Sequence, residues 1–169
     1  MTIRKILTEP DPFLRQKSTD VDEVNNEIRS LMDDMLETMY NAPGIGLAAI
    51  QVGVPKRVIV IDLSKDDEKK NPLYFVNPEI IIKSKQDASY EEGCLSVPNQ
   101  FAEISRPNTC KVKFLDYAGN KKTLEAEGLL ATCIQHEMDH LEGILFIDYL
   151  SKLKRSMIIK KLSKLKSTS

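Results

Sequence analysis

The sequence predicts an α+β fold in which antiparallel or mixed sheets surround a central metal-binding helix, with an N-terminal and a C-terminal helix. Three observations support this prediction. Apolar residues recur at helical spacing near both ends of the chain. Short runs with strand periodicity and turn residues fill the middle. The two histidines of the chain, His136 and His140, lie four residues apart in a third helical stretch.

The composition indicates one globular domain. The chain has 169 residues, which fits a single domain over residues 1–169, and 41% of them are hydrophobic. A net charge of −1 gives no general reason to expect nucleic acid as a partner. No apolar run is long enough for a membrane span or a signal peptide, so we expect no membrane association. Three cysteines are too few for a disulfide framework, which indicates a reducing, cytoplasmic location.

The first helix is predicted from an apolar pattern that ends near the Asn-Ala-Pro-Gly segment at residues 41–44. Its apolar positions are Val24, Ile28, Leu31, Met32, Met35, Leu36 and Met39. Residues 57–63 form a continuous apolar run, which predicts a buried strand, and residues 64–72 a solvated loop. Two short strands follow at 73–76 and 80–82, interrupted by Asn77 and Pro78.

A hairpin precedes the histidines. Residues 111–117 alternate between charged and apolar, as in a half-buried strand, and a turn at 118–120 leads into a strand at 122–127. The next helix begins after Gly128 and ends near Gly143. One stripe of it contains Leu129, Cys133, His136 and His140, and another side contains Leu130, Ile134 and Leu141. We therefore expect one side to pack on the sheet and the other to face a cavity.

The last helix is predicted over about residues 151–166. The expected inward positions are Leu153, Met157, Ile158, Leu162 and Leu165. Its charged residues are all basic: Lys152, Lys154, Arg155, Lys160, Lys161, Lys164 and Lys166. The charge fits a plain solvated face equally well as an electrostatic contact with phosphates.

The pentapeptide His136-Glu137-Met138-Asp139-His140 predicts chemistry. Residues four apart on a helix share one face, roughly 6 Å apart along its axis. Two imidazoles in this position can bind one metal ion, and Glu137 beside them is a candidate general base. Two exposed histidines that bind nothing are the alternative, but the intervening glutamate and the apolar run at 129–134 favour the metal.

A third ligand is expected, because catalytic metal sites usually take three protein ligands. The chain has no third histidine, and no acidic residue follows Asp148. Cys133 lies about 10 Å along the helix from His140, too far to share the ion, and Cys110 reads as a buried apolar residue. Cys94 or an upstream carboxylate remains. Cys94 follows Gly93, which permits close backbone approach, and Pro98 should end regular strand pairing there.

Three motifs make the chain resemble the peptide deformylase family, specifically its bacterial type. They are Gly-Ile-Gly-Leu-Ala-Ala-Ile-Gln at 44–51, Glu-Gly-Cys-Leu-Ser at 92–96 and Gln-His-Glu-Met-Asp-His at 135–140. The resemblance covers nearly the whole chain. It implies removal of the formyl group from N-terminal formylmethionine of new proteins, by metal-hydroxide attack, with release of formate.

The resemblance also implies a role for particular residues. Cys94, His136 and His140 would be the metal ligands. The ligand set alone suggests zinc, whereas the family implies Fe²⁺, with Zn²⁺, Ni²⁺ or Co²⁺ as substitutes. Glu137 would move the proton, and the Gln51 amide and Leu95 N–H would stabilise the oxyanion. The residues implied in substrate binding are Ile45, Gly46, Glu92, Gly93, Leu129 and Cys133, with the His136 ring beside the methionine.

Departures from the family pattern affect peptide preference. Phe101 stands where many bacterial members have arginine, and Tyr90 and Thr132 replace more usual aliphatic residues near the methionine pocket. Ser105 precedes Arg106 where proline is frequent, and we expect Arg106 to pair with Asp139. The family also implies formylmethionyl nascent peptides as substrates and a ribosome contact through the last helix.

Two rival functions remain at this point. One is a different metallopeptidase with the same His-Glu-x-x-His core, although the third histidine or downstream glutamate of those enzymes is missing. The other is a non-catalytic relative that only binds nascent peptides or ribosomes. Intact Gln51, Cys94 and Glu137 argue against it.

Overall fold

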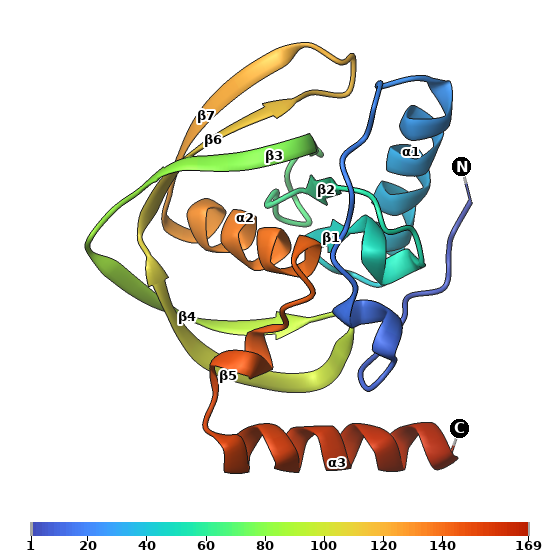
Figure 1. Ribbon diagram of the computed structural model, residues 1–169, viewed down its shortest axis with the longest axis vertical. Helices are drawn as coiled ribbons and strands as arrows, with labels where there is room; N and C mark the ends of the chain where they lie inside the picture. The colour runs from blue at the N-terminus through green and yellow to red at the C-terminus, as the bar shows by residue number, and fades with distance from the viewer. Residues whose placement is uncertain (1, 169) are drawn as a thin grey trace.

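The computed structural model describes the backbone of residues 2–168 and the side chains of residues 2–165 (Figure 1). Met1 and Ser169, the predicted domain ends, and the side chain of Lys166 lie outside these residues. The helices are α1 (Asn26–Asn41), α2 (Gly128–Leu141) and α3 (Lys152–Thr168), with short 3-10 turns η1 (Pro12–Arg15), η2 (Ala49–Val52) and η3 (Phe146–Tyr149). The strands are β1 (Gly46–Ala48), β2 (Val58–Ile61), β3 (Leu73–Lys83), β4 (Asp87–Cys94), β5 (Val97–Pro107), β6 (Thr109–Leu115) and β7 (Lys121–Glu127). The predicted α+β class is confirmed.

The strands form two sheets. Five of them pair in the order β1-β2-β3-β6-β7, and β4 and β5 form a separate hairpin. All strand pairs among the described residues are antiparallel, so the mixed alternative is not observed. Helix α2 lies between the five-stranded sheet and the hairpin, at the centre of the molecule (Figure 1). This central position is the one that the sequence predicted for the helix with the histidines.

Strand β2 is buried on both faces, as its continuous apolar run predicted. Val58 and Val60 belong to the core cluster shared with α1, and Ile59 and Ile61 to the cluster shared with α2. Because successive side chains of a strand point to opposite faces, α1 and α2 pack on opposite sides of this one strand. The two helices thus hold β1 and β2 between them.

Helix α1 confirms the predicted apolar face except at Val24, which precedes the helix and packs on the same core from the incoming segment. Its N-cap is Asn25, whose side chain accepts a hydrogen bond from the Ile28 N–H at 3.0 Å. Leu31, Met32, Met35 and Met39 are buried against the sheet. The methionines are therefore core residues. Because Leu47 and Ala49 belong to the same core cluster, α1 supports the segment that follows it, residues 42–51.

Strand β3 differs from the prediction of two short strands. It is one strand from Leu73 to Lys83 with a register shift between Val76 and Glu79. Asn77 at this bulge has φ = 50°, and its side-chain amide forms two hydrogen bonds with the Val21 backbone, of 2.7 and 2.8 Å. Asn77 and Pro78 therefore bend the strand instead of ending it, because a distant segment replaces the lost pairing.

The β4–β5 hairpin was missed by the sequence analysis. Its strands alternate weakly in hydrophobicity, because the face toward α2 carries Glu92 and Arg106. The expectation that Pro98 ends regular pairing is wrong in part. Pro98 lies inside β5, but the pairing shifts register between Glu92 and Cys94, which leaves the segment from Pro98 to Phe101 as a bulge.

Helix α3 lies along the outside of the hairpin (Figure 1). The predicted inward face is only partly correct. Leu162 is buried and Ile158 packs on the same small core, together with Ile159. Leu153, Met157 and Leu165 are 72, 52 and 49% exposed. Because only one narrow stripe meets the hairpin, simple amphipathic spacing assigned too many residues to the buried side. Among the described residues, no helix is long and apolar enough to cross a membrane.

Candidate metal centre and active site

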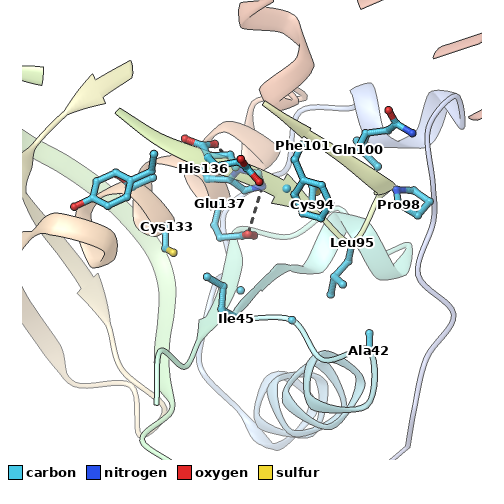
Figure 2. A pocket seen from close by; sticks show the side chains of 18 of the residues that line it. Ala42, Ile45, Cys94, Leu95, Pro98, Gln100, Phe101, Cys133, His136 and Glu137 are labelled. Atoms are coloured by element: carbon cyan, nitrogen blue, oxygen red, sulfur yellow. Dashed lines mark hydrogen bonds and ion pairs between the residues drawn. The ribbon is translucent and has the colours of Figure 1, made fainter. Parts of the chain in front are cut away.

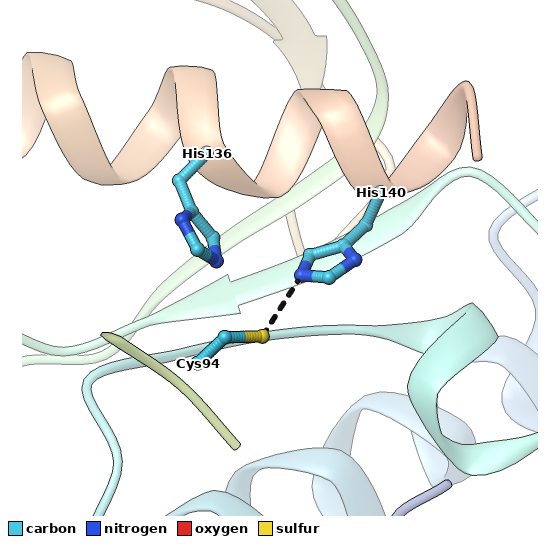
Figure 3. A group of neighbouring side chains, drawn as sticks. All are labelled: Cys94, His136 and His140. Carbon is cyan, nitrogen blue, oxygen red and sulfur yellow. Dashed lines mark hydrogen bonds between the residues drawn. The ribbon is translucent and has the colours of Figure 1, made fainter. Parts of the chain in front are cut away.

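The hairpin and the central helix bring together the three predicted ligands. Cys94 is the last residue of β4, and His136 and His140 lie on successive turns of α2 (Figure 3). Their ligand atoms all lie within 4.8 Å of one another, and Cys94 Sγ is 3.3 Å from His140 Nε2. A thiol and two imidazole nitrogens converge on one point, so the upstream carboxylate considered as third ligand is not needed.

The residues present fit a divalent transition-metal ion. His140 is fully buried, and its Nδ1 has no hydrogen-bond partner among the described residues. Burial, with the charge of His136, lowers the pKa of His140 well below its usual value, so the ring is in the neutral form that binds metals. Burial by itself would lower the pKa of His136. Hydrogen bonds with Cys94 and Glu92 outweigh burial, so the pKa of His136 is raised. The carboxylate of Glu92 beside this ring also favours a bound cation.

Glu92 fixes the orientation of the His136 ring. Glu92 Oε1 is 2.9 Å from His136 Nδ1, which directs Nε2 toward Cys94. Burial opposes ionisation of Glu92, but hydrogen bonds from His136 and Arg106 hold the pKa of its carboxyl below the usual range. A carboxylate on the far nitrogen of a ligating histidine is a common support of metal sites. The side chain of Glu92 also lines the pocket described below.

Arg106 connects this carboxylate to the rest of α2. Its guanidinium donates to both carboxylate oxygens of Glu92 at 2.7 and 3.0 Å and to Asp139 Oδ2 at 2.8 Å. The predicted Arg106–Asp139 pair is confirmed. Tyr149, which the sequence analysis missed, donates its hydroxyl proton to the same Asp139 oxygen at 2.7 Å and lies beside the guanidinium. The sequence around Tyr149 carries no signal for this contact, because the contact arises only when η3 folds back against α2.

Glu137 points into the pocket beside the ligand group. Its side chain is 5% exposed, and Oε1 is 3.8 Å from His136 Nε2. Oε2 has no hydrogen-bond partner among the described residues. Burial is the main reason that the pKa of Glu137 rises to about 7, and the nearby charge of Glu92 adds to it. A carboxyl group with a pKa near neutrality can both accept and donate a proton.

Gln51 is held in one orientation from the opposite side. Its Oε1 accepts a hydrogen bond from the Ala48 N–H at 2.9 Å, so its amino group faces the hairpin. That group lies 2.9 Å from Ser96 Oγ and 3.6 Å from Cys94 Sγ. Ser96, fully buried and part of the Glu-Gly-Cys-Leu-Ser motif, is a supporting residue that the sequence analysis did not single out.

A cavity of about 480 Å³ opens onto this centre (Figure 2). Its wall includes every residue predicted to bind substrate: Ile45, Gly46, Glu92, Gly93, Leu129 and Cys133. Cys94, Leu95, His136 and Glu137 also line it, whereas Gln51 and His140 lie behind the wall. In Figure 2, Cys133 and Ile45 lie on one side of Glu137, and Leu95 and Pro98 on the other.

One part of the cavity wall suits an apolar side chain, because it contains Leu129 and Cys133. The pKa of Cys133 is raised to about 12, mainly because the side chain is buried, so its thiol stays neutral. Tyr90 and Thr132, both departures noted in the sequence, also line the cavity. Gly46 allows the opposite wall to approach closely, because an added Cβ there would lie 3.0 Å from Glu137 Oε1.

Comparison with known proteins agrees with these features. Residues 3–156 match the family model of polypeptide deformylase. The peptide deformylase of Pelagibacter ubique (strain HTCC1062) is 70% identical over 169 residues, covering 99% of this chain and 97% of that protein. The peptide deformylase of Rhizobium meliloti (strain 1021) is 56% identical and covers 99% and 97%.

Solved structures give the same result. The crystal structure of peptide deformylase from Ehrlichia chaffeensis superposes with a TM-score of 0.94, at 43% identity, and covers 99% of this chain and 98% of that one. A second structure of that enzyme, in complex with actinonin, has a TM-score of 0.93 at 45% identity, with 97% and 98% covered. Neither rival function is favoured by these matches. The chain belongs to the polypeptide deformylase family, a family of metal-dependent hydrolases.

Proposed function

We propose that this protein removes the formyl group from the N-terminal formylmethionine of newly synthesised proteins and releases formate. The observation that supports this most directly is the group of three ligand atoms within 4.8 Å, beside Glu137, in a chain of the polypeptide deformylase family. Cys94, His136 and His140 would hold the metal ion. When bound, the ion supplies Lewis acidity and lowers the pKa of a water at the site.

In this proposal Glu137 moves the proton of the reaction. Its free Oε2 accepts a proton from the attacking water and later delivers that proton to the departing amine of methionine. Because burial raises its pKa to about 7, neither transfer requires a large change in free energy near neutral pH. The buried position also keeps bulk water away from the proton while the amide breaks.

Two N–H donors would stabilise the negative charge that develops on the formyl oxygen. The Gln51 amino group is directed toward Cys94 by the bond from Ala48 to its carbonyl oxygen. The Leu95 N–H makes no hydrogen bond with another described residue, so it is available to a substrate oxygen. Donors that are fixed before the reaction stabilise the oxyanion without reorganisation.

The cavity would receive the methionine side chain. Leu129 and Cys133 give it an apolar wall, and the neutral thiol of Cys133 does not repel a thioether. Ile45 and Gly46, with Glu92 and Gly93 across the cavity, would border the peptide backbone. Strand β1 is the edge of its sheet, and an extended peptide can pair with such an edge through its backbone.

The resident metal is proposed to be Fe²⁺, with Zn²⁺, Ni²⁺ or Co²⁺ able to replace it. Membership of the family supports iron, while a Cys-His-His set by itself suits zinc. Metal analysis of protein purified without oxygen tests the choice. Zinc at one equivalent with no iron would contradict it. We further propose a cytoplasmic location, where nascent chains are made.

The decisive assay measures formate release from formyl-Met-Ala-Ser by the metal-loaded protein. We expect multiple turnovers and one free amine per formate. The same protein with the metal removed by a chelator serves as the control and should be inactive. Absence of formate from protein with one bound metal per chain would contradict the proposed function.

A ribosome contact through α3 is the proposed partner interaction. Lys152, Lys154, Lys160 and Lys161 are exposed on this outer helix, which could meet RNA phosphates. Because Leu162 is buried, deleting the helix would disturb the core, so charge removal is the cleaner test. Lys152→Gln, Lys160→Gln and Lys161→Gln together should weaken co-sedimentation with ribosomes at low salt. The control is a second triple variant at exposed lysines outside α3: Lys65→Gln, Lys69→Gln and Lys85→Gln. This control should bind ribosomes as the native protein does. Equal binding by both triple variants would contradict the proposal.

A further inference from the structure

The chain before η1 crosses the two elements that carry the proposed oxyanion donor and its partner. The Leu7 N–H donates to the Gln51 carbonyl oxygen at 2.7 Å, and the Glu9 N–H donates to the Ser96 carbonyl oxygen at 2.8 Å. Gln51 belongs to η2, and Ser96 lies in the turn between β4 and β5. Residues 7–9 therefore join these two elements through backbone hydrogen bonds.

The same two residues meet through their side chains at the metal centre. The Gln51 amino group lies 2.9 Å from Ser96 Oγ and 3.6 Å from Cys94 Sγ. Because Cys94 lies two residues before Ser96, a displacement of the turn relative to η2 would change how the Gln51 amino group faces Cys94. The hydrogen bonds from residues 7–9 oppose that displacement.

Glu9 attaches residues 7–9 to the segment that follows α2. Its side chain is 8% exposed, and Oε2 accepts a hydrogen bond from the Arg15 guanidinium at 3.3 Å. The same guanidinium donates to the Gly143 carbonyl oxygen at 3.3 Å and to Asp148 Oδ2 at 2.6 Å. Gly143 has φ = 75°, and an added Cβ would clash with the Arg15 carbonyl group, so Arg15 packs directly on this backbone. Glu9 is thus bonded to a partner that is itself held in place.

The bond between Glu9 and Arg15 can be changed in length and in charge separately. Burial raises the pKa of Glu9 above its usual value, although the charge of Arg15 acts in the opposite direction. Glutamine has the same length and a carbonyl oxygen that can accept from Arg15, so it preserves the bond without the charge. Aspartate keeps the charge but is one methylene shorter, and alanine removes the bond.

A second arginine attaches the chain nearer its N-terminus. The Arg4 guanidinium pairs with Asp34 of α1 at 2.9 Å, and the Arg4 N–H donates to Thr38 Oγ1 at 2.8 Å. None of these three residues lines the cavity. Arg4 anchors the same part of the chain to α1 and not to the metal centre, which makes it the matched control for Glu9.

We propose that Glu9 is a positioning residue for deformylation. Through Arg15 it holds residues 7–9 across η2 and the β4–β5 turn, and thereby keeps the Gln51 amino group in place to stabilise the oxyanion. Glu9 does not line the cavity, so it acts through Gln51 and not on the substrate. The kinetic part of the inference rests on the proposed function, because only there does Gln51 meet a reacting oxygen.

The kinetic test measures kcat and KM with formyl-Met-Ala-Ser. Glu9→Ala should lower kcat about 5- to 30-fold and change KM by less than about twofold, because a displaced donor loses part of a stabilisation made only in the transition state. Glu9→Asp should show a smaller loss, and Glu9→Gln should stay within about twofold of the native kcat. Arg4→Gln should leave both constants unchanged.

Two kinetic outcomes would overturn the proposal. Equal losses in Glu9→Ala and Arg4→Gln would mean that any loosening of the N-terminal segment has the same effect. If Glu9→Ala does not fold, Glu9→Asp and Glu9→Gln decide, and equal kcat values for these two would count against Glu9. The Ni²⁺ dissociation constant of each variant should equal the native one; a tenfold rise would assign Glu9 to metal binding instead.

Nuclear magnetic resonance of the Zn²⁺-loaded protein gives a readout that needs no turnover. In Glu9→Ala the backbone amides of residues 7 and 9 should exchange with solvent at least about tenfold faster than in the native protein. The Gln51 side-chain amide signals should shift or broaden. Those of Gln135, whose amide bonds the Pro107 and Ala131 carbonyls, should stay unchanged. Native exchange rates and native Gln51 signals in Glu9→Ala would overturn the proposal.

The two measurements separate this inference from the proposed function. If the exchange rates and Gln51 signals change as expected but the native protein releases no formate, the proposed function fails and the positioning of Gln51 by Glu9 stands. If the native protein releases formate and Glu9→Ala matches it in kcat and in its spectra, the inference fails and the function stands.

Discussion

At the scale of the residue, the metal centre depends on hydrogen bonds that hold one end of a side chain and thereby orient its other end. Nδ1 of His136 is taken by Glu92, and Oε1 of Gln51 is taken by Ala48. Each bond leaves the other end of the side chain directed at Cys94. Oε2 of Glu137 has no described partner. The supporting bonds therefore determine which atoms face a substrate.

Glu137→Gln should keep the metal and lose turnover. The amide fits the same space but cannot accept a proton, so kcat with formyl-Met-Ala-Ser should fall on the order of 10² to 10⁴-fold. Metal content by elemental analysis should stay at the native value. Glu142→Gln, one residue past α2 and paired with Arg57, is the control and should remain active. Near-native turnover by Glu137→Gln would show that another group moves the proton.

Arg106→Lys should weaken metal binding, although the charge is kept. Lysine cannot hold both Glu92 oxygens and Asp139 at once, so the His136 ring loses its fixed orientation. We expect the dissociation constant for Ni²⁺, measured by competition with a chelator, to rise about 10- to 100-fold. Arg57→Lys is the control, because Arg57 bonds Glu142 and the Leu141 carbonyl at the end of α2 instead of Glu92. Unchanged affinity in Arg106→Lys would assign Arg106 to stability alone.

At the scale of the element, the β4–β5 hairpin and α2 each supply part of the metal centre. Helix α2 supplies two ligands and Glu137 from one face, while its other face packs Ile134 and Leu141 on the sheet. The hairpin supplies Cys94, Glu92 and Arg106 from strands with little apolar alternation. Helix α3 and η3 cover the outside of the hairpin through a small core that they share with Val97 and Ile104 of β5.

The narrow contact of α3 predicts a sharp difference between two leucines. Leu162→Ala should lower the free energy of unfolding by about 2–5 kcal/mol, because this side chain is 2% exposed in the small core. Leu153→Ala, at 72% exposed, should change it by less than about 0.5 kcal/mol. Urea denaturation of both variants with the metal bound measures the two values. Equal losses would mean that α3 does not dock as described.

At the scale of the whole molecule, a few buried carboxylates join segments far apart in the chain. Asp62, at the end of β2, accepts hydrogen bonds from Tyr40 Oη of α1 at 2.5 Å and from the N–H groups of Ser64 and Asn71 at 2.8 and 3.0 Å. Burial opposes its ionisation, but these bonds outweigh burial and lower the pKa of Asp62. One side chain thus links α1, β2 and the following loop.

Asp62→Asn should make the protein less stable at neutral pH and change its response to acid. A carboxyl whose pKa is lowered by folding stabilises the native state above its unfolded value, near 4, and loses that contribution as pH falls through the folded pKa. We expect a loss of about 1–3 kcal/mol at pH 7 that shrinks below about pH 4. Urea denaturation across this pH range measures it, with the exposed Asp66→Asn as control. A gap that stays constant with pH would contradict this account.

The sequence by itself determined much of this protein. The spacing of the two histidines fixed a shared helix face, and apolar periodicity found α1, α2, β2 and the β6–β7 hairpin, since these signals depend only on neighbours in the chain. The three motifs predicted the family, which the comparisons confirmed. The residue types and their spacing alone left Cys94 or an upstream carboxylate as the third ligand.

Only the tertiary structure decided how distant segments meet. The β4–β5 hairpin has charged residues on its inner face, so its periodicity is hidden until Glu92, Arg106 and Asp139 are seen as one buried network. Tyr149 joins that network from a segment ten residues beyond Asp139. Which leucines of α3 are buried depends on packing between elements, and the position of Phe101 on the cavity wall depends on the bulge in β5. Such contacts join residues far apart in the chain, and local patterns carry no signal for them.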